Sequence, residues 1–98
     1  MKVQAQHPLP TYKRVGNYYC IYINETVTTN QDGETIYQYD SCKVPLLATR
    51  NERIEALIAT RYTIPEELAA INNGGEEYQE YQLFRDFCKQ IADEAPQL

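Results

Sequence analysis

Residues 61–68 constrain this chain most, because they end one helical pattern and start another. In the Thr63-x-x-Glu66 sequence, the Thr63 hydroxyl can accept a hydrogen bond from a free amide of the first helical turn, while the Glu66 carboxylate reaches back to the Thr63 amide. Pro65 supplies a φ that suits this turn. A helix is therefore predicted to begin at about Ile64. Most of the sequence before this stretch is typical of strands, and the sequence after it is typical of helices.

An antiparallel β-hairpin is predicted in the first half of the chain. Residues 12–29 are rich in aromatic and β-branched side chains, and the first strand is expected at residues 15–29. A turn follows at residues 30–33, where Gly33 can adopt the positive φ that hairpin turns require. The return strand is expected at residues 34–46.

Two registers fit this turn. A two-residue loop would pair Gln31 with Glu34, and a three-residue loop would pair Asn30 with Glu34. The first register places Glu25 opposite Asp40, and like charges in that position are destabilising, so the second is favoured. One face of the hairpin would then carry Tyr19, Ile21, Ile23, Val27, Tyr37 and Tyr39. The other face would carry Cys20, Tyr22, Ile36, Cys42 and Val44.

Three helices are predicted after the hairpin. A second capping box, Thr49-x-x-Glu52, starts a helix expected at residues 50–61. The helix expected at residues 64–72 carries Ile64, Leu68 and Ile71 on one face. The last helix, expected at residues 76–95, is long and amphipathic. Its apolar stripe consists of Tyr78, Tyr81, Phe84, Cys88, Ile91 and Ala95.

Strands followed by helices predict the α+β class, in the order ββααα. The 98 residues suit one core, so a single domain is expected at residues 12–98. A flexible arm is expected at residues 1–11, because Pro8 and Pro10 remove amide donors there. No apolar run approaches the roughly 20 residues that a membrane-spanning helix needs, so no membrane partner is expected.

The cysteines and the histidine indicate no catalytic or metal site. Cys20, Cys42 and Cys88 are an odd number at wide spacing, with no secretory signal before them, which favours free thiols in a cytoplasmic setting. None of them has the close spacing that starts a zinc site. His7, the only histidine, lies in the expected arm, where a catalytic base would be poorly held. We therefore expect no enzyme activity, no cofactor, no metal and no small-molecule substrate.

Acidic residues dominate the charge. The formal net charge is −5, and residues 66–98 contain eight carboxylates against two basic side chains, Arg85 and Lys89. Repulsion of phosphates disfavours nucleic acid or an anionic membrane as a partner. Neighbouring carboxylates at residues 66–67 and 76–77 lie in the first turns of predicted helices, where the helix dipole accounts for them.

The nine tyrosines are the unusual feature of the composition. Tyrosine is common in protein interfaces, because it offers a rigid apolar ring with a polar tip. The candidate interaction surface is Tyr18, Tyr19, Tyr22, Tyr37, Tyr39, Tyr78 and Tyr81. The alternative is that the rings half-cover the faces of a small sheet. A third use, stacking on single-stranded nucleic acid beside Lys13, Arg14 and Lys43, has only three basic residues to support it.

The helical half also carries a family resemblance. Its residues are Ile54-x-x-Leu57-Ile58-x-x-Arg61-Tyr62-Thr63-x-x-Glu66-Glu67-Leu68-Ala69-x-Ile71, then Glu77-x-x-x-Tyr81-x-x-Phe84 and Cys88-Lys89-x-x-Ala92. This pattern resembles small uncharacterised proteins encoded among the structural genes of tailed phages and prophages. The resemblance is limited to about residues 54–92. It implies a phage or prophage origin and a structural or assembly role, and it brings no catalytic residue.

These observations predict a non-enzymatic protein–protein interaction module, a phage or prophage structural or assembly protein. Its partner would be another protein or a second copy, met in the host cytoplasm or within a phage particle. The expected surfaces are the tyrosine-rich hairpin face and the amphipathic C-terminal helix. One alternative is a small acidic inhibitor or regulator of a host protein, whose binding would fall steeply as salt rises. Single-stranded nucleic-acid binding is the weakest alternative.

Overall fold

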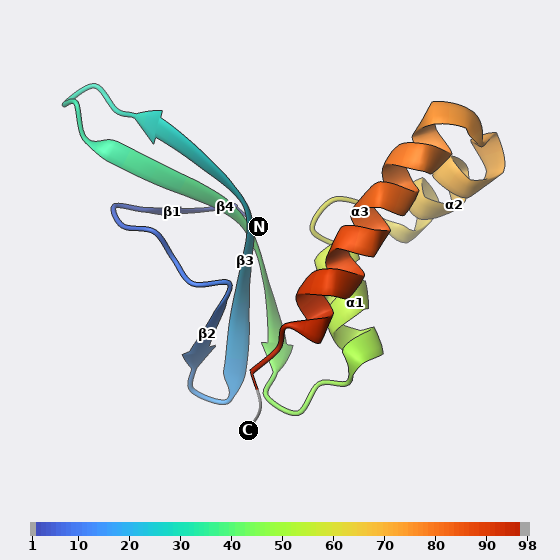
Figure 1. Ribbon diagram of the computed structural model, residues 1–98, viewed down its shortest axis with the longest axis horizontal. Coiled ribbons are helices and arrows are strands. Elements are labelled where there is room, and N and C mark those ends of the chain that lie inside the picture. The colour runs from blue at the N-terminus through green and yellow to red at the C-terminus, as the bar shows by residue number, and fades with distance from the viewer. Residues whose placement is uncertain (1, 97–98) are drawn as a thin grey trace. The chain divides into compact units, whose positions relative to one another are not determined.

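The computed structural model describes residues 2–96, in which four strands precede three helices (Figure 1). The predicted α+β class and the long last helix are confirmed, although the sheet has more strands than a simple hairpin. Contacts divide the chain into two compact units, Met1–Leu47 and Ala48–Leu98. We call them the sheet unit and the helical unit. The division falls inside the single domain expected at residues 12–98.

The described part of the sheet unit forms a four-stranded antiparallel sheet in the order β1-β4-β3-β2. The long strands β3 (Tyr18–Thr29) and β4 (Thr35–Pro45) form the predicted hairpin at its centre (Figure 1). Short strands lie at the two edges, β1 (Lys2–Ala5) beside β4 and β2 (Tyr12–Val15) beside β3.

The two edge strands, β1 and β2, were not predicted from the sequence. Lys2–Ala5 was expected in a loose arm, but it pairs with β4, and the Lys2 ammonium lies 3.1 Å from the Asp40 carboxylate. The first strand, expected to run unbroken over residues 15–29, is interrupted at Gly16. With a φ of 61°, Gly16 takes the positive value needed for the two-residue turn that folds β2 back onto β3. The sheet therefore recruits residues on both sides of the predicted hairpin.

The favoured hairpin register holds only near the turn. The Asn30 amide donates to the Glu34 carbonyl at 3.0 Å, as predicted. A β-bulge between Ile23 and Thr26 then shifts the pairing by one residue, and Asn24 has a φ of 56° there. Because side chains alternate between faces, a shift of one residue moves part of a strand to the other face.

The predicted composition of the two faces is consequently wrong beyond the bulge. Val44 pairs with Tyr19, and so lies on the face that was expected to lack it. The ring of Tyr39 instead contacts that of Tyr22, with centroids 5.9 Å apart. The buried side chains of the sheet unit are Tyr19, Ile21, Ile23, Tyr39 and Val44.

The described helical unit contains α1 (Arg50–Ile58), α2 (Ile64–Asn73) and α3 (Gly75–Asp93). Both predicted capping boxes are present, at Thr49 and at Thr63. α1 ends three residues before its expected end, because the Thr60 and Arg61 amides donate to carbonyls three residues back and tighten the chain. None of the helices in residues 2–96 is long and apolar enough to cross a membrane.

α1 and α2 each pack on α3 (Figure 1). The apolar stripe predicted for the last helix forms the core at four of its six positions, and Tyr78 and Ala95 are the exceptions. Tyr62, between α1 and α2, makes an edge-on contact with Tyr81 at 5.3 Å and a tilted contact with Phe84 at 5.8 Å. The buried side chains are Ala48, Ile54, Leu57, Ile58, Ala70, Tyr81, Phe84, Cys88, Ile91 and Ala92.

Candidate functional site

The seven candidate tyrosines do not form one open surface. Tyr18 and Tyr78 are exposed, and Tyr22 and Tyr37 are half-buried. The remaining three, Tyr19, Tyr39 and Tyr81, are buried, which removes them from any preformed surface. The tyrosines recur at the spacing of strands and helices in the sequence. This spacing shows which residues share a face, but not which face is buried by other parts of the protein.

The hydroxyl of Tyr39 shows how the sheet unit uses a buried ring. It accepts a hydrogen bond from the Leu9 amide at 2.9 Å and donates one to the Glu25 carboxylate at 2.6 Å. Desolvation and the bond to Glu25 both raise the pKa of Tyr39. The ring therefore links the chain after β1 to the bulge region of β3, which is a structural role.

The cysteines and His7 form no disulfide and no metal-ligand cluster within residues 2–96. Cys20, Cys42 and Cys88 are not joined in disulfides, as predicted. Burial raises the pKa of Cys42 to about 11, so this thiol stays protonated near neutral pH. His7 is exposed. Among residues 2–96, no group of three or more His, Cys, Asp or Glu side chains could hold a metal ion.

The helical unit contains a groove of about 730 Å³ between α1 and α3, and Ile64 and Glu67 in the first turn of α2 also line it. Its volume lies within the roughly 300–1,000 Å³ typical of ligand pockets. Ile54, Ile58 and Tyr81 contribute its most buried lining, and Tyr62 is half-buried beside them. The floor of the groove is therefore apolar and suits an aliphatic or aromatic occupant.

Charged side chains surround this floor. Arg50, Arg85 and Lys89 line the groove together with two carboxylates, Glu55 and Glu67. Glu67 accepts a hydrogen bond from the Tyr81 hydroxyl at 2.8 Å. The lining thus has more cations than anions, although the chain as a whole is acidic.

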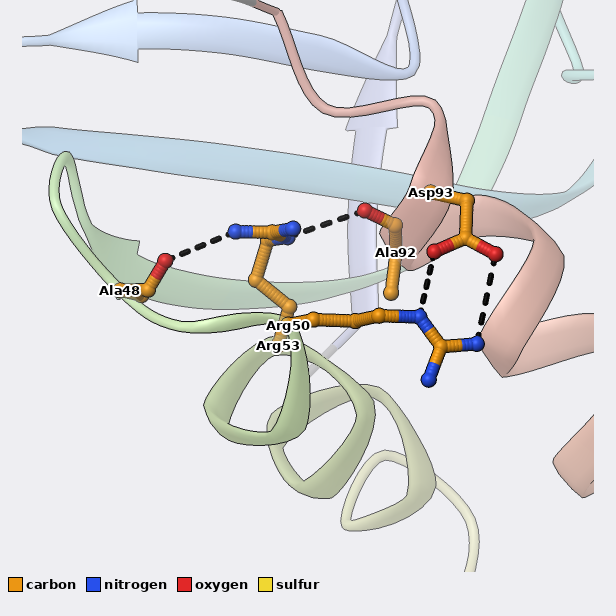
Figure 2. Close-up of polar contacts among 5 residues, drawn as sticks. All are labelled: Ala48, Arg50, Arg53, Ala92 and Asp93. Carbon is orange, nitrogen blue, oxygen red and sulfur yellow. Dashed lines mark hydrogen bonds and ion pairs between the residues drawn. The ribbon is translucent and has the colours of Figure 1, made fainter.

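One end of the groove is fixed by contacts between α1 and the end of α3 (Figure 2). Arg50 donates two hydrogen bonds to the Asp93 carboxylate, and these bonds lower the pKa of Asp93. Arg53 donates to the Ala48 carbonyl at 2.7 Å and to the Ala92 carbonyl at 3.0 Å. Sequence reasoning missed these bonds because most join residues about 40 positions apart. They tie the start of α1 to the end of α3.

α2 carries the most exposed apolar surface in the helical unit. Ile64, Leu68 and Ile71 are 74%, 55% and 45% exposed, and we call them the α2 stripe. The spacing correctly places them on one face, but this face does not enter the core. α2 instead buries Ala70, whose small side chain allows close approach to α3, while Glu67 bonds to Tyr81. The helical period alone could not show which of these faces is buried.

The surroundings of the α2 stripe are acidic. Residues 64–80 contain five carboxylates and no lysine or arginine. The carboxylates are Glu66, Glu67, Glu76, Glu77 and Glu80. An apolar stripe in a region of negative electrostatic potential favours a partner whose surface is positively charged.

Comparison of the chain with protein-family models, with curated proteins and with solved structures finds no match. The resemblance of residues 54–92 to phage and prophage proteins therefore stays a prediction.

Proposed function

We propose that this chain is a non-enzymatic protein-interaction module that binds its partner through the α2 stripe. The observation that carries the proposal is the exposure of Ile64, Leu68 and Ile71 on a helix whose other side packs on α3. Contiguous apolar surface of this kind marks interaction sites. Anchors at positions i, i+4 and i+7 are those with which a helix docks in an apolar groove.

The size of the stripe indicates what else the partner must provide. Full burial of an isoleucine or leucine contributes about 1.5–3 kcal/mol, so three partly exposed side chains give a few kcal/mol. Association costs about 4–15 kcal/mol of lost freedom. The stripe therefore needs help from its flanks, where Glu67 supplies a carboxylate. The partner that fits is an apolar surface bordered by lysine or arginine.

The setting is proposed from the resemblance, which includes the stripe. It favours a structural or assembly protein of a phage or prophage, acting in the host cytoplasm or in the particle. The five carboxylates of residues 64–80 also support the second candidate, an acidic inhibitor or regulator of a host protein. Salt separates the two, because an inhibitor held mainly by charge loses affinity steeply as ionic strength rises.

Site-specific photo-cross-linking tests the interaction. A benzoylphenylalanine at position 68 is irradiated in extracts of the cells that carry the gene. We expect a discrete protein adduct that disappears when Ile64→Gln and Ile71→Gln are added. The matched control places the same group at position 83, because Leu83 is 72% exposed and lies outside the stripe. No adduct at position 68, or the same adducts from both positions, would refute the proposal.

A further inference from the structure

We propose that the partner of the α2 stripe is the groove between α1 and α3 of a second copy of this chain, and that two copies form a closed dimer. The inference rests on the proposed function and names its partner. It follows from three properties of the helical unit: the shape of the groove, its charge, and its position beside the stripe.

The groove and the stripe match in length and in chemistry. The α1 wall runs from Arg50 to Ile58 and the α3 wall from Tyr81 to Lys89, each roughly 12 Å at 1.5 Å per residue. The α2 stripe spans seven residue steps, or roughly 10 Å. Apolar anchors of this length can therefore lie along the apolar floor between the two walls.

The charges of the two surfaces are opposite. Arg85 and Lys89 stand one turn apart on the α3 wall, and Arg85 makes no ion pair with a carboxylate within residues 2–96. Lys89 lies 4.0 Å from Asp86, and both side chains are exposed to solvent. Glu67 precedes the central residue of the stripe by one position and lies beside the stripe on the helix surface, about 100° away. A copy that inserts its α2 thus brings a carboxylate to a wall that carries two cations.

The position of Ile64 favours a closed dimer. Ile64 belongs to the stripe and also lines the groove, so the two surfaces adjoin. A two-fold axis near this residue lets each copy place its stripe in the groove of the other. Such an interface uses the same surface patch on both subunits and closes at two copies.

The experiment measures mass by sedimentation equilibrium on the whole chain over a range of concentrations. We expect wild type to approach twice 11.4 kDa. A stripe variant (Leu68→Gln with Ile71→Gln) and a groove variant (Arg85→Glu with Lys89→Glu) should each raise the dissociation constant at least tenfold. Leu83→Gln is the control and should leave it unchanged. Circular dichroism confirms that each variant is folded, and Leu68→Gln and Lys89→Gln alone replace any that is not.

Mixing the two variants is the decisive step. A heterodimer keeps one intact contact, in which the unaltered stripe of the groove variant meets the unaltered groove of the stripe variant. We expect an equimolar mixture to dimerise more tightly than either variant alone. Association of stripe with stripe could not give this rescue. A wild type that stays monomeric, an open-ended oligomer, or a mixture without rescue would overturn the inference.

The failure of this inference is distinct from failure of the proposed function. A monomeric wild type whose position 68 still cross-links to a different protein, with loss on stripe substitution, refutes the dimer and keeps the interaction module. A monomer without any adduct refutes both.

Discussion

The helices of one unit and the edge strands of the other differ in how far apart in the sequence the hydrogen bonds lie that set their limits. α1 and α2 begin at capping boxes, in which Thr49 bonds to Glu52 and Thr63 to Glu66, three residues on. The sheet unit depends on partners far away, as in the pairing of β1 with β4 and the bond from Leu9 to Tyr39, 30 residues on. The limits of a helix can therefore be specified by neighbouring residues, whereas an edge strand forms only where a partner strand is present.

The largest expected effect tests the core of the helical unit. Phe84 is buried, and its ring contacts those of Tyr62 and Phe87. Phe84→Ala should lower the free energy of unfolding by about 3–5 kcal/mol, because it removes buried carbon and leaves a cavity. Urea denaturation followed by circular dichroism measures this loss. An unchanged midpoint would mean that α3 is not held by this core.

Removal of a local cap should cost less. Thr63→Ala deletes the hydroxyl that accepts from the Glu66 amide at 3.3 Å, and caps of this kind contribute about 1 kcal/mol. Thr63→Ser keeps the hydroxyl and is the matched control. If both variants lose the same stability in urea, the methyl group and not the cap matters, and the claim that α2 is locally specified fails.

Removal of a long-range bond should cost a similar amount in the sheet unit. Tyr39→Phe keeps the ring but leaves the Leu9 amide and the Glu25 carboxylate without this partner, at a cost of about 1 kcal/mol. Tyr37→Phe is the control, because Tyr37 is half-buried and its hydroxyl makes no hydrogen bond to Leu9, Glu25 or another side chain within residues 2–96. Amide exchange at Leu9 should quicken only in Tyr39→Phe. Equal exchange in both variants would contradict the structural role of Tyr39.

The same contrast explains what the sequence could and could not predict. Helix starts, the hairpin turn and the register next to it follow from residues a few positions apart. The bulge at Asn24 could not be predicted, because it depends on how β3 and β4 pair along their whole length. No local sequence signal in either strand marks its position. β1 was missed for a similar reason. Lys2 is recognisable as a strand residue only when it is known to pair with Asp40 of β4.

The candidate site was predicted in part. The spacing places Ile64, Leu68 and Ile71 on one face of α2. The opposite face carries alanines, and a helix of this kind can bury either the large apolar face or the alanine face. The structure buries Ala70 and exposes the larger side chains. The tyrosines were less predictable, because an amphipathic ring suits both a core with a bonded hydroxyl and an open surface.

The pH dependence of stability tests the contacts that Asp40 of β4 makes with Asn24 of β3 and Lys2 of β1. Burial opposes ionisation of Asp40, but hydrogen bonds from Asn24 and Lys2 outweigh it and lower its pKa below 3.8. A carboxyl with a lowered folded pKa stabilises fully above its unfolded pKa, and this contribution is lost as pH falls through the folded value. Asp40→Asn should therefore flatten part of the decline in stability below about pH 4. An equally steep decline in the variant would show that other carboxyls, such as Asp93, cause it.

The smallest expected effect concerns two leucines of the helical unit that differ in burial. Leu57 and Leu68 both occupy apolar helical positions, but Leu57 is fully buried and Leu68 is 55% exposed. Leu68→Gln should change the free energy of unfolding by less than about 0.5 kcal/mol, because exposed substitutions rarely cost more and glutamine is nearly as good a helix former as leucine. Leu57→Ala should cost about 2–5 kcal/mol. The measurement needs dilute protein, since association through the stripe would itself add stability. A loss at Leu68 approaching that at Leu57 would mean that α2 turns this face inward, and then neither a partner nor a second copy could use it.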